Sequence, residues 1–238
     1  MNRFCAPLLI LLTAVVIADD TWITVPGIIV QPHGGLSIGG LTVELVHYDA
    51  TWRLTSPRQA VQARGRVAEG VWSLTGDWRM GETVAQLTQT LVLEGSDAVR
   101  LKAALAGKPP TNAFALVVTL EGALFRSGEI RIDGQPLILP VDSASTQVRT
   151  TAPATLVAVP LPTGGWLEVS GTLSVLVQDH RTWKSDSFSI RIVADSDLAI
   201  EAVLRLRPAA VVPLPLGAAA AIPLRDDVVG DGKGGWSD

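Results

Sequence analysis

Thiol chemistry is almost absent from this 238-residue sequence, which contains a single cysteine, Cys5. Cys5 lies in an apolar N-terminal run, and the rest of the chain has no thiol. That part of the chain can form no disulfide, hold no zinc through thiolates and use no cysteine nucleophile. An exported protein without disulfides is more typical of a bacterial secreted or periplasmic protein than of a small eukaryotic extracellular domain.

The N-terminus has the features of a secretory signal peptide. Arg3 precedes an apolar run that ends at Ile17, and the small residue Ala18 follows. We predict that residues 1–18 are removed ahead of Asp19, which makes the protein secreted or periplasmic. The alternative is an uncleaved anchor helix, but the run is shorter than the roughly 20 apolar residues of a bilayer span. No later segment is long and apolar enough to cross a membrane.

The sequence also lacks an excess of basic residues and two common functional motifs. Its 19 Lys and Arg and 23 Asp and Glu give a net charge of −4 without a basic stripe, so nucleic acid is not an expected partner. HExxH and P-loop motifs are missing, so neither a zinc site of the HExxH kind nor a P-loop nucleotide site is predicted, and no catalytic residue is assigned. His33, His47 and His180 are too dispersed for a histidine metal site.

Alternating apolar and polar residues recur along the chain and predict an all-β fold. In "WLEVSGTLSVLVQD" (166–179) and "DLAIEAVLRLR" (197–207), every second residue is apolar, as in a half-buried strand. Further strands are expected at 98–105 and 188–195, and turns at 95–97 and at Asp133-Gly134. About a dozen strands favour one large sandwich of the supersandwich kind, and two tandem smaller sandwiches are the alternative.

The amino-acid composition changes after residue 207. We divide the chain into a signal peptide (1–18), a β-sandwich domain (19–207), a Pro/Ala-rich connector (208–224) and a Gly/Asp-rich tail (225–238). Prolines in the connector exclude a regular helix and a central strand, so an extended segment is expected. The tail is either the start of a further module or disordered.

Calcium binding is the one metal chemistry that the tail could offer. Asp226, Asp227 and Asp231 could supply oxygen ligands, but their spacing does not match an EF-hand loop, and solvated charges are the alternative. We therefore assign no metal site and no cofactor.

Seven tryptophans stand beside one tyrosine and four phenylalanines, which is an unusual ratio. Trp72 and Trp78 are an even number of residues apart, so they share one face of the predicted strand. Two indoles on one face can form a platform on which sugar rings stack, and ordinary core packing is the alternative.

A polar loop between two predicted strands is the other candidate site. "QDHRTWKSDS" (178–187) places Trp183 among His180, Arg181 and Lys184. An indole beside hydrogen-bonding side chains is a plausible ligand-binding tip. The alternative is that Trp183 folds back over the end of the sandwich.

Two stretches carry a family resemblance. "GVWSLTGDWRMGETVAQLTQTLVLEGSDAVRLKAALAG" and "ALVVTLEGALFRSGEIRIDGQPLILP" resemble the supersandwich-type β domains near the N-terminus of large secreted bacterial carbohydrate-active proteins. The closing "DDVVGDGKGGWSD" resembles the start of a galactose-binding-like module. The resemblance implies an ancillary, non-catalytic domain that precedes a glycan-binding or glycan-degrading part. It carries over no catalytic residue.

Three functions are compatible with these observations. The first is an ancillary carbohydrate-associated module of a secreted bacterial protein, with polysaccharide and further C-terminal domains as partners. The second is a structural or cell-surface assembly domain without a small ligand. The third is a glycoside hydrolase fragment, although its pair of carboxylates cannot be identified from the sequence.

Overall fold

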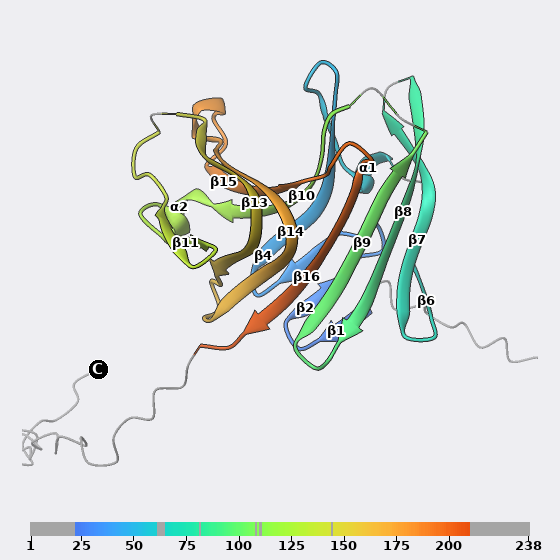
Figure 1. Cartoon of the computed structure of the whole chain (residues 1–238), viewed down its shortest axis with the longest axis horizontal. Helices are drawn as coiled ribbons and strands as arrows, with labels where there is room; N and C mark the ends of the chain where they lie inside the picture. Colours follow the sequence, from blue (N-terminus) through green and yellow to red (C-terminus); the bar gives the residue numbers. More distant parts are fainter. Residues whose placement is uncertain are drawn as a thin grey trace, which may run out of the picture. The chain divides into compact units, whose positions relative to one another are not determined.

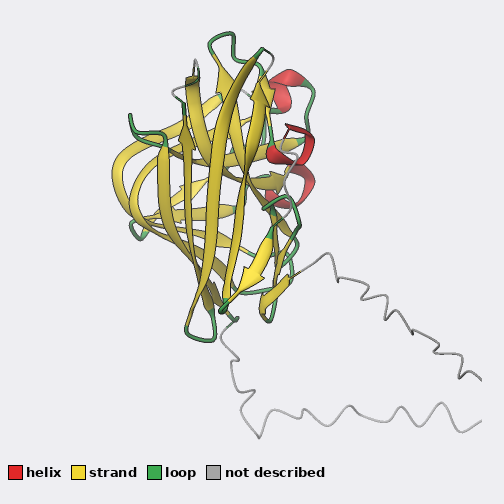
Figure 2. Cartoon of the chain, turned by 90° about the vertical axis from the view of Figure 1, so that its right-hand side faces the viewer, coloured by secondary structure: helices red, strands yellow, loops and turns green. Residues whose placement is uncertain are grey.

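Strands dominate the described part of this computed structural model, as the sequence predicted. The description covers residues 22–60, 65–80, 82–107, 109, 111–143 and 145–209. The predicted signal peptide, nearly all of the Pro/Ala-rich connector and the Gly/Asp-rich tail lie outside these residues. The helical segments are the single turns α1 (Pro57–Ala60), α2 (Gly122–Phe125) and the 3-10 turn η1 (Arg181–Trp183), which lie to one side of the strands (Figure 2). None of the described helices could cross a bilayer.

A single curled antiparallel sheet of 16 strands forms the domain (Figure 1). Its first half runs in spatial order as β1 (Trp22–Val25), β2 (Ile28–Val30), β3 (Leu36–Ile38), β4 (Leu41–Asp49), β10 (Thr111–Glu121) and β15 (Ser187–Val193). Its second half runs as β16 (Ala199–Arg207), β9 (Ala98–Ala106), β8 (Thr83–Glu94), β7 (Val71–Met80) and β6 (Arg66–Ala68). The sequence predicted about a dozen strands, which is too few, because several of the observed strands have only three or four residues and give little alternation to detect.

The long strand β14 (Trp166–Asp179) joins the two halves. On one edge it pairs with β13 (Gln147–Pro160), which leads to β11 (Glu129–Ile132) and β12 (Gln135–Ile138). On the other edge, residues 166–170 pair with β16 and residues 174–179 pair with β15. The sheet therefore forks at residues 171–173 of β14. The remaining short strand, β5 (Leu54–Thr55), pairs with the end of β4.

The two halves of the sheet pack against each other around one core. Trp78 of β7 contacts Phe114 of β10 and His47 of β4 edge-to-face, each with ring centroids 6.2 Å apart. One continuous cluster of buried apolar side chains extends from Ile28 to Leu204 and includes residues of both halves. Because a tandem pair of sandwiches would have two separate cores, the structure favours one large sandwich.

Alternation and turn chemistry explain why these segments form these strands. In β14, Leu167, Val169 and Leu173 are buried on the core face, as their spacing predicted. Between β11 and β12, Asp133 and Gly134 both have positive φ values, of 50° and 77°. These values suit a two-residue hairpin turn, which the glycine allows at low steric cost.

One part of the sheet departs from simple alternation. On β4, β10 and β15, residues on the outer face are buried as well as residues on the core face. Val46, Tyr48, Ala115 and Val117 form a second, smaller apolar cluster there, against which Val193 packs. A sandwich normally presents polar side chains on its outer face, so this buried apolar patch departs from the usual pattern.

Candidate functional site

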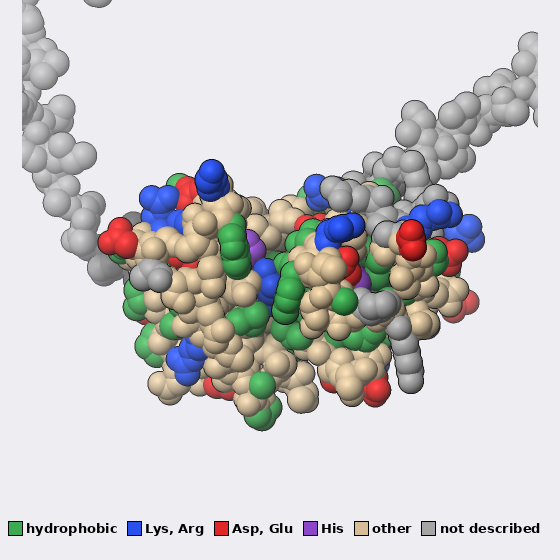
Figure 3. Space-filling model, turned by 90° about the horizontal axis from the view of Figure 1, so that it is seen from above, with side chains coloured by type: hydrophobic (Ala, Val, Ile, Leu, Met, Phe, Trp, Pro, Cys, Tyr) green, Lys and Arg blue, Asp and Glu red, His purple; other side chains and the backbone are tan. Residues whose placement is uncertain are grey.

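Two surface features of the described chain are candidates for a site. From above, the molecule is hollowed between two raised parts, and hydrophobic side chains gather in the hollow (Figure 3). The first feature is a groove at the fork of the sheet. The second is a row of aromatic and basic side chains on the outer face of β4, β10 and β15.

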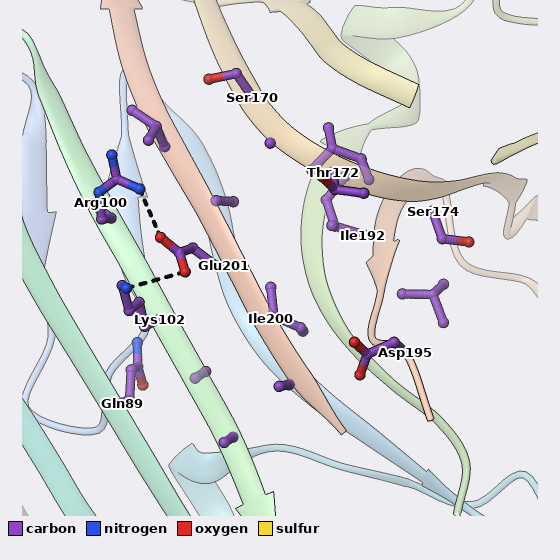
Figure 4. A pocket seen from close by; sticks show the side chains of 18 of the residues that line it. Gln89, Arg100, Lys102, Ser170, Thr172, Ser174, Ile192, Asp195, Ile200 and Glu201 are labelled. Atoms are coloured by element: carbon purple, nitrogen blue, oxygen red, sulfur yellow. Dashed lines mark hydrogen bonds and ion pairs between the residues drawn. The ribbon is translucent and has the colours of Figure 1, made fainter. Parts of the chain in front are cut away.

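The groove has a volume of about 850 Å³ and lies where β14 changes its pairing partner (Figure 4). Mostly small residues line it, from strands β8, β9, β13, β14, β15 and β16. Examples are Thr88, Ala104, Ser170, Gly171, Thr172 and Ser174. No aromatic residue is among those that line it, so the groove offers no ring on which a sugar could stack.

The charges of the groove neutralise one another. Glu201 on β16 accepts an ion-paired hydrogen bond from Arg100 at 2.7 Å and lies 3.1 Å from the ammonium of Lys102 (Figure 4). The hydrogen bonds from these two side chains, first that of Arg100, lower the pKa of Glu201. Glu201 therefore stays ionised near neutral pH and is not suited to be the general acid of a hydrolase.

The row consists of five side chains in successive contact. Trp52 tilts against Tyr48 with 5.9 Å between ring centroids, and the guanidinium of Arg191 lies 4.6 Å from the centre of the Tyr48 ring. On its other side, Arg191 approaches His180, with 3.4 Å between Nη2 and Nε2. His180 in turn contacts Trp183 edge-to-face at 5.5 Å. We call these residues the aromatic–arginine row.

The two ends of the row are open and its middle is covered. Trp52 and Trp183 are 63% and 58% exposed, whereas Tyr48 is 8% and Arg191 is 6% exposed. Each indole contacts its neighbour in the row in a tilted or edge-on geometry. Because both indoles are more than half exposed, each keeps ring surface that is accessible to a planar or apolar ligand.

A tight hairpin positions the Trp52 end. Tyr48 belongs to β4, and Trp52 lies in the turn toward β5 with a positive φ of 63°. The Asp49 carboxylate accepts hydrogen bonds from the Thr51 hydroxyl and from the backbone N–H groups of Thr51 and Arg53, at 2.7–2.9 Å. These bonds, that of the Thr51 hydroxyl first, lower the pKa of Asp49. The Asp49 side chain thus stabilises the turn that carries Trp52.

Contacts of the Arg181 side chain position the Trp183 end of the row. Arg181 donates to both carboxylate oxygens of Asp179 at 2.7–2.9 Å, and to the backbone carbonyls of Pro140 and Val141. Its guanidinium also lies 4.6 Å from the centre of the Phe188 ring. The hydrogen bonds from Arg181 lower the pKa of Asp179.

This geometry gives Arg181 a structural role. Its side chain donates to Asp179 and two carbonyls, so it stabilises the loop, and its predicted contact with a ligand stays a prediction. His180 and Trp183 are brought together in the row, as predicted for the loop. Lys184 follows them in a left-handed conformation with φ of 63°, and it is exposed.

The tryptophan pair predicted on one strand face lies elsewhere. Trp72 and Trp78 do share one face of β7, and that face points into the core, where they are 2% and 0% exposed. Their burial matches the core-packing alternative, and they present no face to a sugar ring. Neither residue belongs to the candidate site.

The histidines have separate surroundings. His47 is fully buried, with Nε2 2.9 Å from the Thr111 hydroxyl oxygen. His180 Nε2 lies 2.8 Å from the Ser189 hydroxyl oxygen. Burial is the first cause that lowers the pKa of His33, His47 and His180, and the charge of Arg191 lowers that of His180 further. No group of three potential metal ligands occurs in the described residues; Asp226, Asp227 and Asp231 lie outside them.

Sequence reasoning missed three members of the row: Tyr48, Trp52 and Arg191. Tyr48 and Arg191 lie at outer-face positions of their strands, where a polar or isolated residue is unremarkable. The available indication was the run "LVHYD" in β4, where apolar residues occupy both faces. The contact between distant segments could not be read from the chain, because β4 meets β15 only through β10.

A scan against known protein families finds no match for this chain, and a search of curated proteins finds none either.

Proposed function

We propose that this chain is a non-catalytic module of a secreted bacterial protein and binds a glycan through the aromatic–arginine row. The observation that carries the proposal is the pair of exposed indoles, Trp52 and Trp183, at the two ends of one connected set of side chains. Pyranose rings have apolar faces that pack on indoles, while their hydroxyls need polar neighbours.

The surroundings of the row supply such polar groups. Ser189 and His180 are hydrogen-bonded to each other, and Gln178 lies opposite Ser189 on the neighbouring strand. Lys184 is exposed beside Trp183. Ser189 and Gln178 lie on strands, and His180 directly precedes the 3-10 turn and is hydrogen-bonded to Ser189, so little conformational entropy is lost on binding.

The described residues favour binding over hydrolysis. Glycoside hydrolysis requires one carboxyl group that keeps its proton near neutral pH. In the described chain, each carboxylate with a shifted pKa has that pKa lowered rather than raised: Asp49, Asp133, Asp179 and Glu201. The supersandwich resemblance fits the same proposal.

Alanine substitution of the two indoles tests the proposal. We expect Trp52→Ala and Trp183→Ala each to weaken retardation in affinity gels, run with a panel of plant and algal polysaccharides, by about ten- to a hundredfold. This corresponds to the loss of about 1–3 kcal/mol of anchor energy. Trp183→Phe, which keeps an aromatic face, should retain most of the affinity.

Two controls test whether a loss of retardation reflects the loss of a binding contact. Leu124→Ala removes another exposed apolar side chain, 61% exposed and outside the row, and should leave retardation unchanged. The melting temperature of the Trp variants should stay near that of the parent, because both indoles are exposed. If no polysaccharide retards the parent protein, or if the double Trp variant binds as well as the parent, the proposal is wrong. The assembly-domain alternative then gains support.

A further inference from the structure

Arg191 is the most unusual member of the aromatic–arginine row. It projects from the outer face of β15, between Val117 of β10 and Leu176 of β14, which are its direct cross-strand neighbours. The side chain is 6% exposed and stacks on the Tyr48 ring. A cation in such an apolar setting is expected to have an anionic partner.

No described carboxylate forms an ion pair with Arg191. Its Nε is buried and has no hydrogen-bond partner among the described residues, and the same is true of Oε1 of the nearby Gln178. Burial lowers the pKa of Arg191, so the surroundings disfavour its charge. Several other arginines of the described chain have a carboxylate partner: Arg100, Arg126, Arg131, Arg181, Arg205 and Arg207.

The acidic side chain in the same cross-strand row does not fill this role. Glu44 lies opposite Val117 on β4, so a whole strand separates it from Arg191. Two strand spacings place the two backbones roughly 10 Å apart. Arg191 also approaches His180, whose Nε2 lies close to the Ser189 hydroxyl oxygen. Their mutual hydrogen bond leaves one of the two free to donate to an anion, either His180 through Nδ1–H or Ser189 through its hydroxyl, according to which of them donates to the other.

We propose that Arg191 and His180 form a subsite for the anionic group of an acidic sugar, a carboxylate or a sulfate ester. This inference rests on the proposed function, because it places the charged unit of a glycan between rings that stack on Trp52 and Trp183. A guanidinium matches the two oxygens of a carboxylate or sulfate, and removal of water strengthens the pairing. The anion supplies the partner that the described protein residues do not.

Matched acidic and neutral polysaccharides test this subsite at fixed low ionic strength. The pairs are polygalacturonate with methyl-esterified galacturonan, and dextran sulfate with dextran. We expect the parent protein to bind the acidic member of at least one pair about tenfold more tightly, and the responding pair distinguishes carboxylate from sulfate. Arg191→Gln should remove this preference. Lys102→Gln removes an exposed cation in the groove and should leave it intact.

A second measurement does not depend on folding of the Arg191 variant. In ¹⁵N-labelled parent protein, titration with sodium glucuronate should shift the Nε–H resonance of Arg191 saturably, and titration with glucose plus sodium chloride at equal ionic strength should not. Failure of glucuronate to shift that resonance, together with equal binding of acidic and neutral polymers, overturns the subsite.

The outcomes separate the two proposals. If neutral and acidic polymers bind equally and Trp183→Ala weakens both, glycan binding stands and the anion subsite is wrong. If glucuronate shifts the Arg191 resonance but no polymer is retained, the anion subsite stands and its assignment to a glycan is wrong. If Lys102→Gln abolishes the preference as fully as Arg191→Gln, the preference reflects general surface charge, and the subsite is overturned.

Discussion

Arg181 and Arg191 are both largely shielded from solvent and approach the same histidine loop, yet their guanidinium groups have opposite surroundings. Arg181 pairs with the fully buried Asp179, and its side chain is 10% exposed. Arg191 has an aromatic ring and a histidine instead. Identical side chains thus have different partners, because Arg181 forms an ion pair with a carboxylate and Arg191 forms none with a described carboxylate.

The Asp179–Arg181 pair leads to a prediction about stability. Arg181→Met should lower the free energy of unfolding by about 3 kcal/mol, because it leaves the buried Asp179 carboxylate without its counter-charge. For a domain of this size, that corresponds to a drop in melting temperature of roughly 6–12 °C. Differential scanning calorimetry measures the change.

A matched substitution provides the control. Arg126 forms a 2.6 Å ion pair with Asp186 in which both side chains are about half exposed. Arg126→Met should cost less than about 1 kcal/mol, because solvent screens such a pair. Equal effects of the two substitutions would show that burial does not strengthen the Asp179–Arg181 pair.

At the scale of elements, β14 holds the two halves of the sandwich together. Its first residues pair with β16 and its last residues pair with β15, so the change of partner falls between Ser170 and Ser174. Gly171 lies at this point with a φ of 153°, and a Cβ there would be 3.0 Å from the carbonyl oxygen of Glu201. The fork therefore needs a residue without a side chain.

Substitution at the fork should destabilise the whole sandwich. We expect Gly171→Val to lower the free energy of unfolding by about 1–3 kcal/mol through backbone strain and the close approach to Glu201. The midpoint of urea unfolding measures this change. Thr172→Val adds the same side chain at the neighbouring exposed position and should shift stability by less than about 0.5 kcal/mol. A Gly171→Val protein as stable as its parent would show that the backbone relaxes without strain.

At the scale of the whole molecule, one main core serves the described sheet, and ionisable groups are shielded from solvent both in this core and on the outer face. His33, His47 and His180 come from different parts of the chain, and burial lowers the pKa of each from its ordinary value of 6.5. The folded protein therefore binds fewer protons on these rings than the unfolded chain does in mildly acidic solution.

This proton difference predicts how stability depends on pH. Because the unfolded chain binds more protons below about 6.5, the free energy of unfolding should fall as the pH drops from 7.5 to 5. The carboxylates with lowered pKa add a further loss only nearer 3.8, their ordinary value, so they do not dominate this window. Urea unfolding at pH 7.5, 6 and 5 measures the slope.

A histidine substitution identifies the source of the slope. His47→Gln keeps a group that can hydrogen-bond to Thr111 but does not titrate, so it should make the pH dependence shallower. If the free energy of unfolding stays constant or rises as the pH is lowered from 7.5 to 5, the histidines of the folded state do not resist protonation.

The amino-acid sequence by itself determined the all-β class, most of the long strands and several turns. These features depend on neighbours in the chain: the alternation in "WLEVSGTLSVLVQD" sets which side chains of β14 face the core, and Asp133-Gly134 sets the hairpin between β11 and β12. Local backbone preferences and a period of two residues suffice for such predictions. The loop that presents Trp183 was located in the same way.

Only the tertiary structure decided which polar and aromatic residues are buried in the core and which are exposed. Trp78 and Trp183 are the same side chain in similarly polar sequence surroundings, but one is enclosed by Phe114 and His47 and the other is exposed. The aromatic–arginine row exists because β10 and β15 bring Tyr48 close to Arg191 across 143 residues of chain. Burial and the contacts across a sheet depend on pairing between distant strands, which the local pattern of a single chain does not encode.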